Sequence, residues 1–269
     1  MNKIVSKIIW IVALVAVIVL ISVVGYGYYK KATLDVKNPV ATMEVENFGT
    51  IKIELYPEYA PETVANFITL SNRGFYDGLT FHRIVKDFMI QGGDKNGDGT
   101  GSASISDLKD GGEDEEYTIK GEFIANGVNN KLKFEEGVLA MARSDYSQYS
   151  SSLKEESYNS GSSQFFIMTK ENTSLNGYYA AFGKVIEGMD IVHNIEAVEV
   201  KSNSDSEGTE DTSSSSEVST PVNPPVITSI RVETHGVDYG LPETLEPFDY
   251  MSWMYKQYGI SSDGTTTVE

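Results

Sequence analysis

The chain has 269 residues, with 39 acidic and 21 basic side chains, so its formal net charge at neutral pH is −18. Proteins bind phosphate backbones through clusters of Lys and Arg, and this acidic balance therefore argues against nucleic acid as a partner. The chain has no cysteine, which excludes disulfides, thiolate catalysis and cysteine-ligated zinc.

The first segment predicts a membrane anchor. Residues 8–24 are apolar except for Ser22, and the aromatic run at 25–29 extends them. A helix of about 22 residues at ~1.5 Å per residue spans about 33 Å, one hydrocarbon core. We therefore expect a transmembrane anchor over residues 1–31 and a spacer over 32–39.

A cleaved signal peptide is the alternative, although its apolar region is usually shorter and no Ala-x-Ala site precedes Lys30. Lysines flank the segment on both sides, so the charge rule leaves its orientation open. Both readings place the rest of the chain outside the cytoplasm, unless the helix inserts in reverse. The expected location is the cell membrane, single-pass with the folded part extracytoplasmic, or secretion after cleavage.

The next segments predict a hairpin and a helix. Residues 40–46 and 50–55 alternate apolar and polar side chains around the turn residues 47–49. Pro61 suits the first position of a helix, and Gly74 lies just past its expected end.

Residues 81–94 are the central stretch. Their apolar side chains fit neither a clean strand nor a clean helix, and polar groups, Arg83 among them, interrupt them before a Gly-Gly pair. We expect two buried strands with a bend between them. By pattern alone, Arg83 is as well explained as a surface residue on core strands.

Later elements follow the same rules. Strands are expected at 137–142, 163–169 and 226–232, and a helix at 187–198. The low-complexity acidic stretch 201–225 predicts a disordered insertion. The acidic tail, 236–269, carries aromatic residues that either pack on the body as a short helix or dock a partner.

Two further segments have plain interpretations. Asp94, Asn96, Asp98 and Gly99 match the first half of an EF-hand loop, but Ile105 stands where the bidentate Glu is required, so no calcium site is expected. The polar insertion 144–160 is interpreted as a solvated loop, with a role in substrate access as the alternative.

Four motifs, read together, resemble the cyclophilins, the cyclosporin-binding class of peptidyl-prolyl cis-trans isomerases. They are FHRI at 81–84 with FMIQGGD at 88–94, GVLAMA at 137–142, GSSQFFI at 161–167, and LNG at 175–177 with FGKV at 182–185. They occur in the family's order and cover residues 40–235. Their combination is far more specific than any one of them.

The resemblance implies a mainly β fold: a closed antiparallel eight-stranded barrel capped by two helices, here preceded by the anchor. It implies isomerisation of X-Pro bonds, with proline-containing polypeptides as partners and with no cofactor and no metal. Combined with the predicted anchor, it predicts that the clients are exported proteins, and we expect a monomer. Two alternatives remain at this stage. One is a holdase that binds prolyl peptides with little turnover, and the other is a scaffold that uses the barrel as an inert platform.

Arg83 would need only to donate a hydrogen bond to the twisted X-Pro amide. The X-Pro amide resists rotation by ~18–20 kcal/mol because resonance stiffens its C–N bond. In the twisted amide the nitrogen regains a lone pair that a fixed guanidinium can donate to. The resemblance makes Arg83 catalytic and assigns substrate binding to a set of nine residues: Phe88, Met89, Gln91, Ala142, Arg143, Gln164, Phe166, Leu175 and Tyr179.

Two positions depart from the family pattern. Tyr179 stands where many members have histidine, and it can still close the pocket and offer a hydroxyl. Ser174 stands where many have a tryptophan that contacts cyclosporin, so weak cyclosporin binding is expected.

Overall fold

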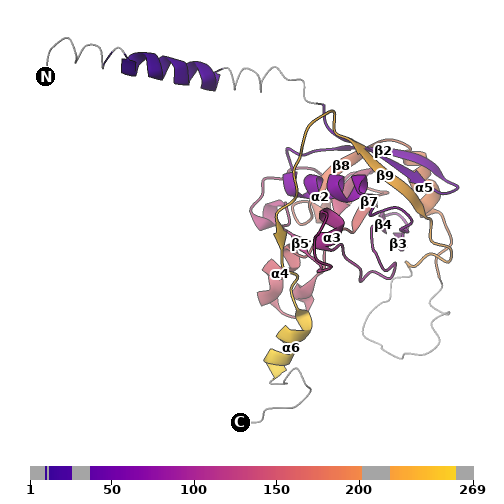
Figure 1. The fold of residues 1–269 in the computed structure, drawn as a ribbon. Coiled ribbons are helices and arrows are strands. Elements are labelled where there is room, and N and C mark those ends of the chain that lie inside the picture. The colour runs from indigo at the N-terminus through magenta and orange to yellow at the C-terminus, as the bar shows by residue number, and fades with distance from the viewer. Residues whose placement is uncertain (1–9, 11, 26–36, 202–218, 259–269) are drawn as a thin grey trace. The chain divides into compact units, whose positions relative to one another are not determined.

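The computed structural model describes residue 10 and residues 12–25, 37–201 and 219–258. The chain divides into two units, Met1–Lys37 and Asn38–Glu269. In the first unit, residues 10 and 12–25 are helical (Figure 1). Within the described ranges, no helix is both long enough and apolar enough to cross a membrane. The remaining parts of the predicted anchor, residues 1–9, 11 and 26–31, lie outside the described residues.

The second unit is a curled antiparallel sheet with helices around it (Figure 1). Eight strands form the main sheet in the order β3-β4-β7-β6-β8-β2-β1-β9, and β10 pairs with β5. The strands are β1 (Val40–Val45), β2 (Gly49–Leu55), β3 (Arg83–Val85), β4 (Met89–Gly92), β5 (Thr118–Ile119), β6 (Val138–Met141), β7 (Phe165–Met168), β8 (Ala181–Glu187), β9 (Ile227–Glu233) and β10 (Thr244–Leu245).

Helices complete the described part of this unit. The α-helices are α2 (Pro61–Asn72), α3 (Ile105–Leu108), α4 (Lys154–Tyr158), α5 (Met189–Glu196) and α6 (Tyr250–Tyr258). The 3₁₀ helices are η1 (Ile124–Asn126), η2 (Tyr146–Gln148), η3 (Ser151–Leu153) and η4 (Thr173–Leu175). The two predicted capping helices are α2 and α5, whereas α3 and α4 have no counterpart among the sequence predictions.

The eight strands agree with the prediction, but the closed barrel is wrong. Strands β3 and β9 are the two edges of the sheet, and in the described residues no ladder pairs them. The chain beside them is joined by one bridge, Thr80 with Val226, and by separate backbone hydrogen bonds, such as that from the Phe81 amide to Pro225 O at 3.0 Å. Prolines 224 and 225 come directly before that bridge. Because proline has no backbone N–H, it cannot extend a ladder of hydrogen bonds, and the sheet stays open there.

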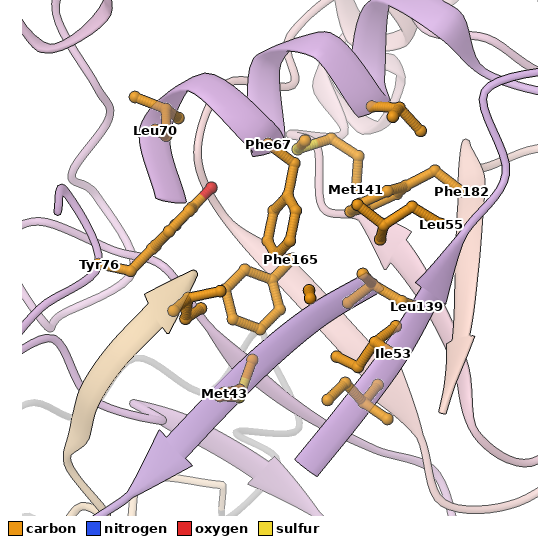
Figure 2. Packing of buried hydrophobic residues seen from close by; sticks show 14 of the residues in the cluster. Met43, Ile53, Leu55, Phe67, Leu70, Tyr76, Leu139, Met141, Phe165 and Phe182 are labelled. Carbon is orange, nitrogen blue, oxygen red and sulfur yellow. The ribbon is translucent and has the colours of Figure 1, made fainter. Parts of the chain in front are cut away.

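Local chemistry explains the helices that cap this sheet. Pro61 begins α2, and Gly74 follows its end with a φ of +79°, a conformation that glycine adopts without steric cost. The inner side of α2 is fully buried, and the ring of Phe67 meets that of Phe165 edge-on at 5.7 Å (Figure 2). Helix α5 adds Val192 and Ile195 to the same core.

Strand alternation separates two apolar layers. Ile90, Leu139 and Phe165 point into the main core, where Figure 2 shows Leu139 and Phe165 packed with Phe182. Residues next to them in sequence, such as Met89, Ala140 and Phe166, point to the other face. They belong to a second cluster: Met89, Phe134, Val138, Ala140, Phe166, Met168 and Ala181. This outer layer is the one that bears the candidate site, since successive strand residues face opposite sides.

Two C-terminal expectations change in detail. Residues 219–225, the end of the predicted disordered insertion, have defined contacts: the Lys201 amide donates to Thr220 O at 2.8 Å, and Val200 bridges Pro221. Residues 202–218 lie outside the described residues. The tail forms β10 and then α6, so the predicted short helix is confirmed.

Candidate active site

The site is built on one row of the sheet. The register pairs Arg83 of β3 with Gln91 of β4, Gln91 with Phe166 of β7, and Phe166 with Ala140 of β6. Neighbouring strands lie about 4.8 Å apart, so these four residues form a line across the outer face. Met89, two residues from Gln91 along β4, shares that face.

A pocket of about 190 Å³ lies over this row. Its floor is apolar, because it is formed by the buried side chains of Met89 and Phe166. It is lined by nine of the ten predicted site residues: Arg83, Phe88, Met89, Gln91, Ala142, Arg143, Phe166, Leu175 and Tyr179. The structure therefore brings together, in one place, residues that the sequence scatters over about a hundred positions.

Arg83 is oriented by a relay of side-chain amides. Its Nη1 donates to Gln91 Oε1 at 3.3 Å. Gln91 Nε2 in turn donates to Gln164 Oε1 at 2.9 Å, and Gln164 Nε2 donates to the carbonyls of Gly99 and Gly101, both at 3.0 Å. Because each amide has its oxygen and its nitrogen engaged, the oxygen of Gln91 is held toward the guanidinium.

Asp94 anchors the loop at the far end of this relay. Its buried carboxylate accepts hydrogen bonds from the amides of Asn96, Gly99 and Gly101. Those contacts occupy the side chain that opens the EF-hand-like sequence. Across the described ranges, no group of three or more His, Asp or Glu side chains is arranged to hold a metal ion.

Arg143 forms the rim between two cavities. Its guanidinium carbon lies 4.5 Å from the ring centroid of Tyr179 and 5.3 Å from that of Tyr158. The Tyr179 ring also meets Phe166 edge-on at 5.7 Å. Tyr179 thus lines the pocket and is held there by ring packing and a cation–π contact.

A second cavity of about 270 Å³ adjoins the first and shares Gln91, Ala142 and Arg143 with it. Gln164, the tenth predicted residue, lines this cavity. Sequence reasoning missed the rest of its lining: Gly99, Thr100, Ser102, Ser144, Ser160, Ser162 and Ser163. The available signal was that the polar loop 95–102 and the insertion 144–160 flank the motifs on either side.

The turn that carries Phe88 is held by hydrogen bonds to Glu196 and Thr169. Asp87 has a φ of +58°, which is unfavourable for a non-glycine residue. Its amide donates to Glu196 Oε1 of α5 at 2.7 Å, and the Phe88 carbonyl accepts from the amide of Thr169 at 3.0 Å. Thr169 Oγ1 also donates to Glu196, at 2.6 Å. Position and orientation of the pocket wall therefore depend partly on α5.

The histidines do not enter the site. His82 is buried beneath it, and burial lowers its pKa below the ordinary 6.5, so the ring is neutral at pH 7. His193 on α5 lies between Glu196 and Glu136, at 3.1 and 2.6 Å, and its hydrogen bond with Glu196 raises its pKa above 6.5. Ser174 is exposed on η4 and does not line the pocket, and the weak binding of cyclosporin stays a prediction.

The geometry defines a class of protein. An apolar pocket of side-chain size, with a guanidinium on one wall and a polar cavity beside it, suits an extended peptide that inserts one compact apolar ring. The site contains no cysteine and no nucleophile–base pair among its lining residues. It is built for binding and for donating hydrogen bonds, which are the requirements of amide rotation.

The chain belongs to the cyclophilin family. The family model for cyclophilin type peptidyl-prolyl cis-trans isomerase/CLD matches residues 40–229. Peptidyl-prolyl cis-trans isomerase B of Bacillus subtilis (strain 168) is 40% identical over 151 residues, covering 56% of this chain and 86% of the relative. Peptidyl-prolyl cis-trans isomerase-like 1 of Homo sapiens is 36% identical over 157 residues, covering 58% of this chain and 79% of the relative.

A solved structure agrees with this assignment. The cyclophilin type isomerase of Cryptosporidium parvum, crystallised in the presence of the dipeptide Ala-Pro, superposes with a TM-score of 0.54 at 27% identity. The match covers 72% of this chain and 98% of that one. The chain is thus a cyclophilin-type peptidyl-prolyl cis-trans isomerase in both fold and sequence.

Proposed function

We propose that Arg83 is the catalytic residue and that it stabilises the twisted X-Pro amide. The observation that carries this proposal is the relay through Gln91 and Gln164, which holds the guanidinium at the edge of the apolar pocket. As the amide twists, the proline nitrogen becomes a hydrogen-bond acceptor. A donor that meets it only in that state lowers the barrier without tightening ground-state binding.

The pocket supplies the second part of the mechanism. Phe88, Met89 and Phe166 offer apolar surface to the proline ring, while Gln164 and the backbone of residues 142–143 are suited to hold the peptide preceding it. With the ring fixed, rotation moves the preceding residue past Arg83. The Ala-Pro dipeptide present with the Cryptosporidium protein supports this choice of ligand.

The test compares Arg83→Ala with the wild type on a short Ala-Pro peptide. A hydrogen bond to a charged group is worth about 1.5–3 kcal/mol, so kcat/KM should fall about 10- to 100-fold while the fold is retained. Arg73→Ala is the matched control, because Arg73 is an arginine whose side chain instead pairs with Asp110, at 2.6 Å. Its activity should equal the wild type.

The opposite result has a clear meaning. If folded wild type binds the peptide but does not accelerate its isomerisation, the chain is a prolyl-peptide holdase and Arg83 has no catalytic role. If Arg83→Ala retains full kcat/KM, another group stabilises the twisted amide.

The clients and the location extend this proposal. We assign the chain to the outer side of a cell membrane, acting as a monomer on exported proteins, because residues 8–24 are almost wholly apolar. Fractionation of cells tests this: the full chain should stay with membranes at alkaline pH and be digested by protease added outside. Recovery in the cytosol would refute it.

A further inference from the structure

Two segments outside the four family motifs meet on the surface of the second unit. One is the insertion 144–160, and the other is the tail, which begins beyond the family match at residue 229. Five aromatic rings join them, and we call this set the aromatic surface: Tyr146, Tyr149, Phe248, Tyr250 and Trp253. The Tyr149 and Tyr250 ring centroids are 4.6 Å apart, and those of Tyr146 and Tyr250 are 6.1 Å apart and stacked.

The tail that supplies three of these rings is attached to the body. Its strand β10 pairs with β5, and the Glu243 amide donates to Glu62 Oε2 of α2 at 2.6 Å. The chain can be followed in Figure 1 from β9 through β10 to α6. The tail that forms the aromatic surface is therefore attached to the rest of the unit at two places, the β10–β5 pairing and the Glu243–Glu62 hydrogen bond.

Its composition resembles that of antibody binding loops. Of the 17 residues at 144–160, seven are Ser and three are Tyr. Binding loops favour these two types, because tyrosine offers a large amphipathic face at low entropic cost and serine offers adaptable hydrogen bonds. The Tyr149 side chain is 56% exposed, and Met251 on α6 is 49% exposed. Apolar area thus remains available to a partner after the rings have packed together.

The aromatic surface continues directly from the polar cavity of the active site. Ser144 and Ser160 line that cavity, and the Ser144 amide donates a hydrogen bond to Ser160 Oγ at 2.9 Å. Tyr146 follows Ser144 by two residues, so their Cα atoms are at most about 7.6 Å apart. Two or three residues of an extended peptide span that distance.

We propose that the aromatic surface binds an apolar segment of the same polypeptide whose proline occupies the active site. This inference rests on the proposed function. The cavity lined by Gln164 and residues 142–143 is expected to hold the residues preceding the proline, so the segment lies several residues on the N-terminal side. The preferred client is an unfolded chain with aromatic or large aliphatic side chains about four to six positions before the proline.

Fluorescence gives a direct test, because Trp10 and Trp253 are the two tryptophans of the chain. The full chain carrying Trp10→Phe reports on Trp253 alone. We would titrate it with three acetylated peptides: a tetrapeptide containing Ala-Pro, a decapeptide with Leu-Leu about five residues before the proline, and the same decapeptide with Leu-Leu after the proline.

Only the peptide with upstream leucines should shift the emission of Trp253. Its Kd should also be about fivefold to tenfold lower than that of the downstream peptide. Tyr149→Ser should bring the two Kd values together and leave tetrapeptide isomerisation unchanged. Ile186→Ser, which alters a side chain on β8 that is 50% exposed, is the matched control and should keep the preference.

The failures are distinguishable. Absence of tetrapeptide isomerisation refutes the proposed function. Normal tetrapeptide isomerisation with equal Kd values and a silent Trp253 refutes this inference alone. An emission shift with vesicles of phosphatidylcholine and phosphatidylglycerol but not with peptides replaces it by a lipid surface, and a shift that depends on protein concentration replaces it by self-association.

Discussion

Asp94→Asn is the substitution that best separates the architecture of the active site from its chemistry. Asp94 is 1% exposed and touches neither cavity, yet its carboxylate orders the loop whose carbonyls hold Gln164. Asparagine is the same size but has one acceptor oxygen and one amino group. The amino group would face a backbone N–H, so at least one amide, such as that of Gly99, loses its acceptor.

The structure sets the magnitude. Hydrogen bonds to a charged acceptor contribute about 1.5–3 kcal/mol, so the free energy of unfolding should fall by about 2–3 kcal/mol. The loop would then orient Gln164 less firmly, and the relay to Arg83 would weaken. Loss of about 1 kcal/mol of transition-state stabilisation corresponds to a roughly fivefold decrease in kcat/KM.

Chemical denaturation and peptide isomerisation, measured well below the unfolding midpoint, supply the two numbers. Asp98→Asn is the matched control: Asp98 lies in the same loop, but its side chain is exposed and accepts hydrogen bonds from Thr100 alone, so this variant should lose much less stability than Asp94→Asn. The reasoning is refuted if Asp94→Asn is as stable as wild type. It is also refuted if calcium stabilises the wild type and the variant abolishes that effect, because the carboxylate would then serve a metal.

Two further predictions concern α5 and the histidines. Glu196→Ala removes the hydrogen-bond acceptor that holds the turn carrying Phe88. KM for a short prolyl peptide should therefore rise about threefold to tenfold with kcat nearly unchanged, and the Asp87 amide should exchange its hydrogen faster. Glu196→Gln keeps an acceptor oxygen and should restore much of the difference. An unchanged exchange rate of the Asp87 amide would contradict the proposed role of Glu196 in holding this turn. In an NMR titration of the imidazoles, His193 should titrate above pH 6.5 and His82 below it. By linkage, His82 makes the fold lose stability as the pH falls below about 6.5, whereas the contribution of His193 is present below 6.5 and is lost as the pH rises through its folded pKa. The reverse order of titration would show that burial and the two carboxylates do not control these groups.

Local sequence patterns predicted several strands and helices of the fold. The hairpin at 40–55, the helix that begins at Pro61 and the two strands within 81–94 follow from turn residues, proline at the first helical position and side-chain alternation, all of which act over a few neighbouring residues. The four motifs identified the family and the ten predicted site residues, nine of which line one pocket.

Other expectations depended on contacts that local patterns do not encode. The prediction of a closed barrel was wrong at the proline pair before β9, where one bridge and a few separate hydrogen bonds stand in place of a ladder. The insertion 144–160, interpreted as a solvated loop, packs against a tail a hundred residues away through Tyr146 and Phe248. Such ring pairs leave no periodic signal in either segment.

The sequence by itself determined which segments become strands and helices, and that Arg83 stands among apolar neighbours. The tertiary structure decided what Arg83 can do. Its position beside Gln91 and Phe166 follows from the register between β3, β4 and β7, and a shift of one residue in that register would turn each of these side chains to the opposite face. Register is set by the packing of both faces of the sheet at once, by residues far apart along the chain, and no single stretch of sequence contains it.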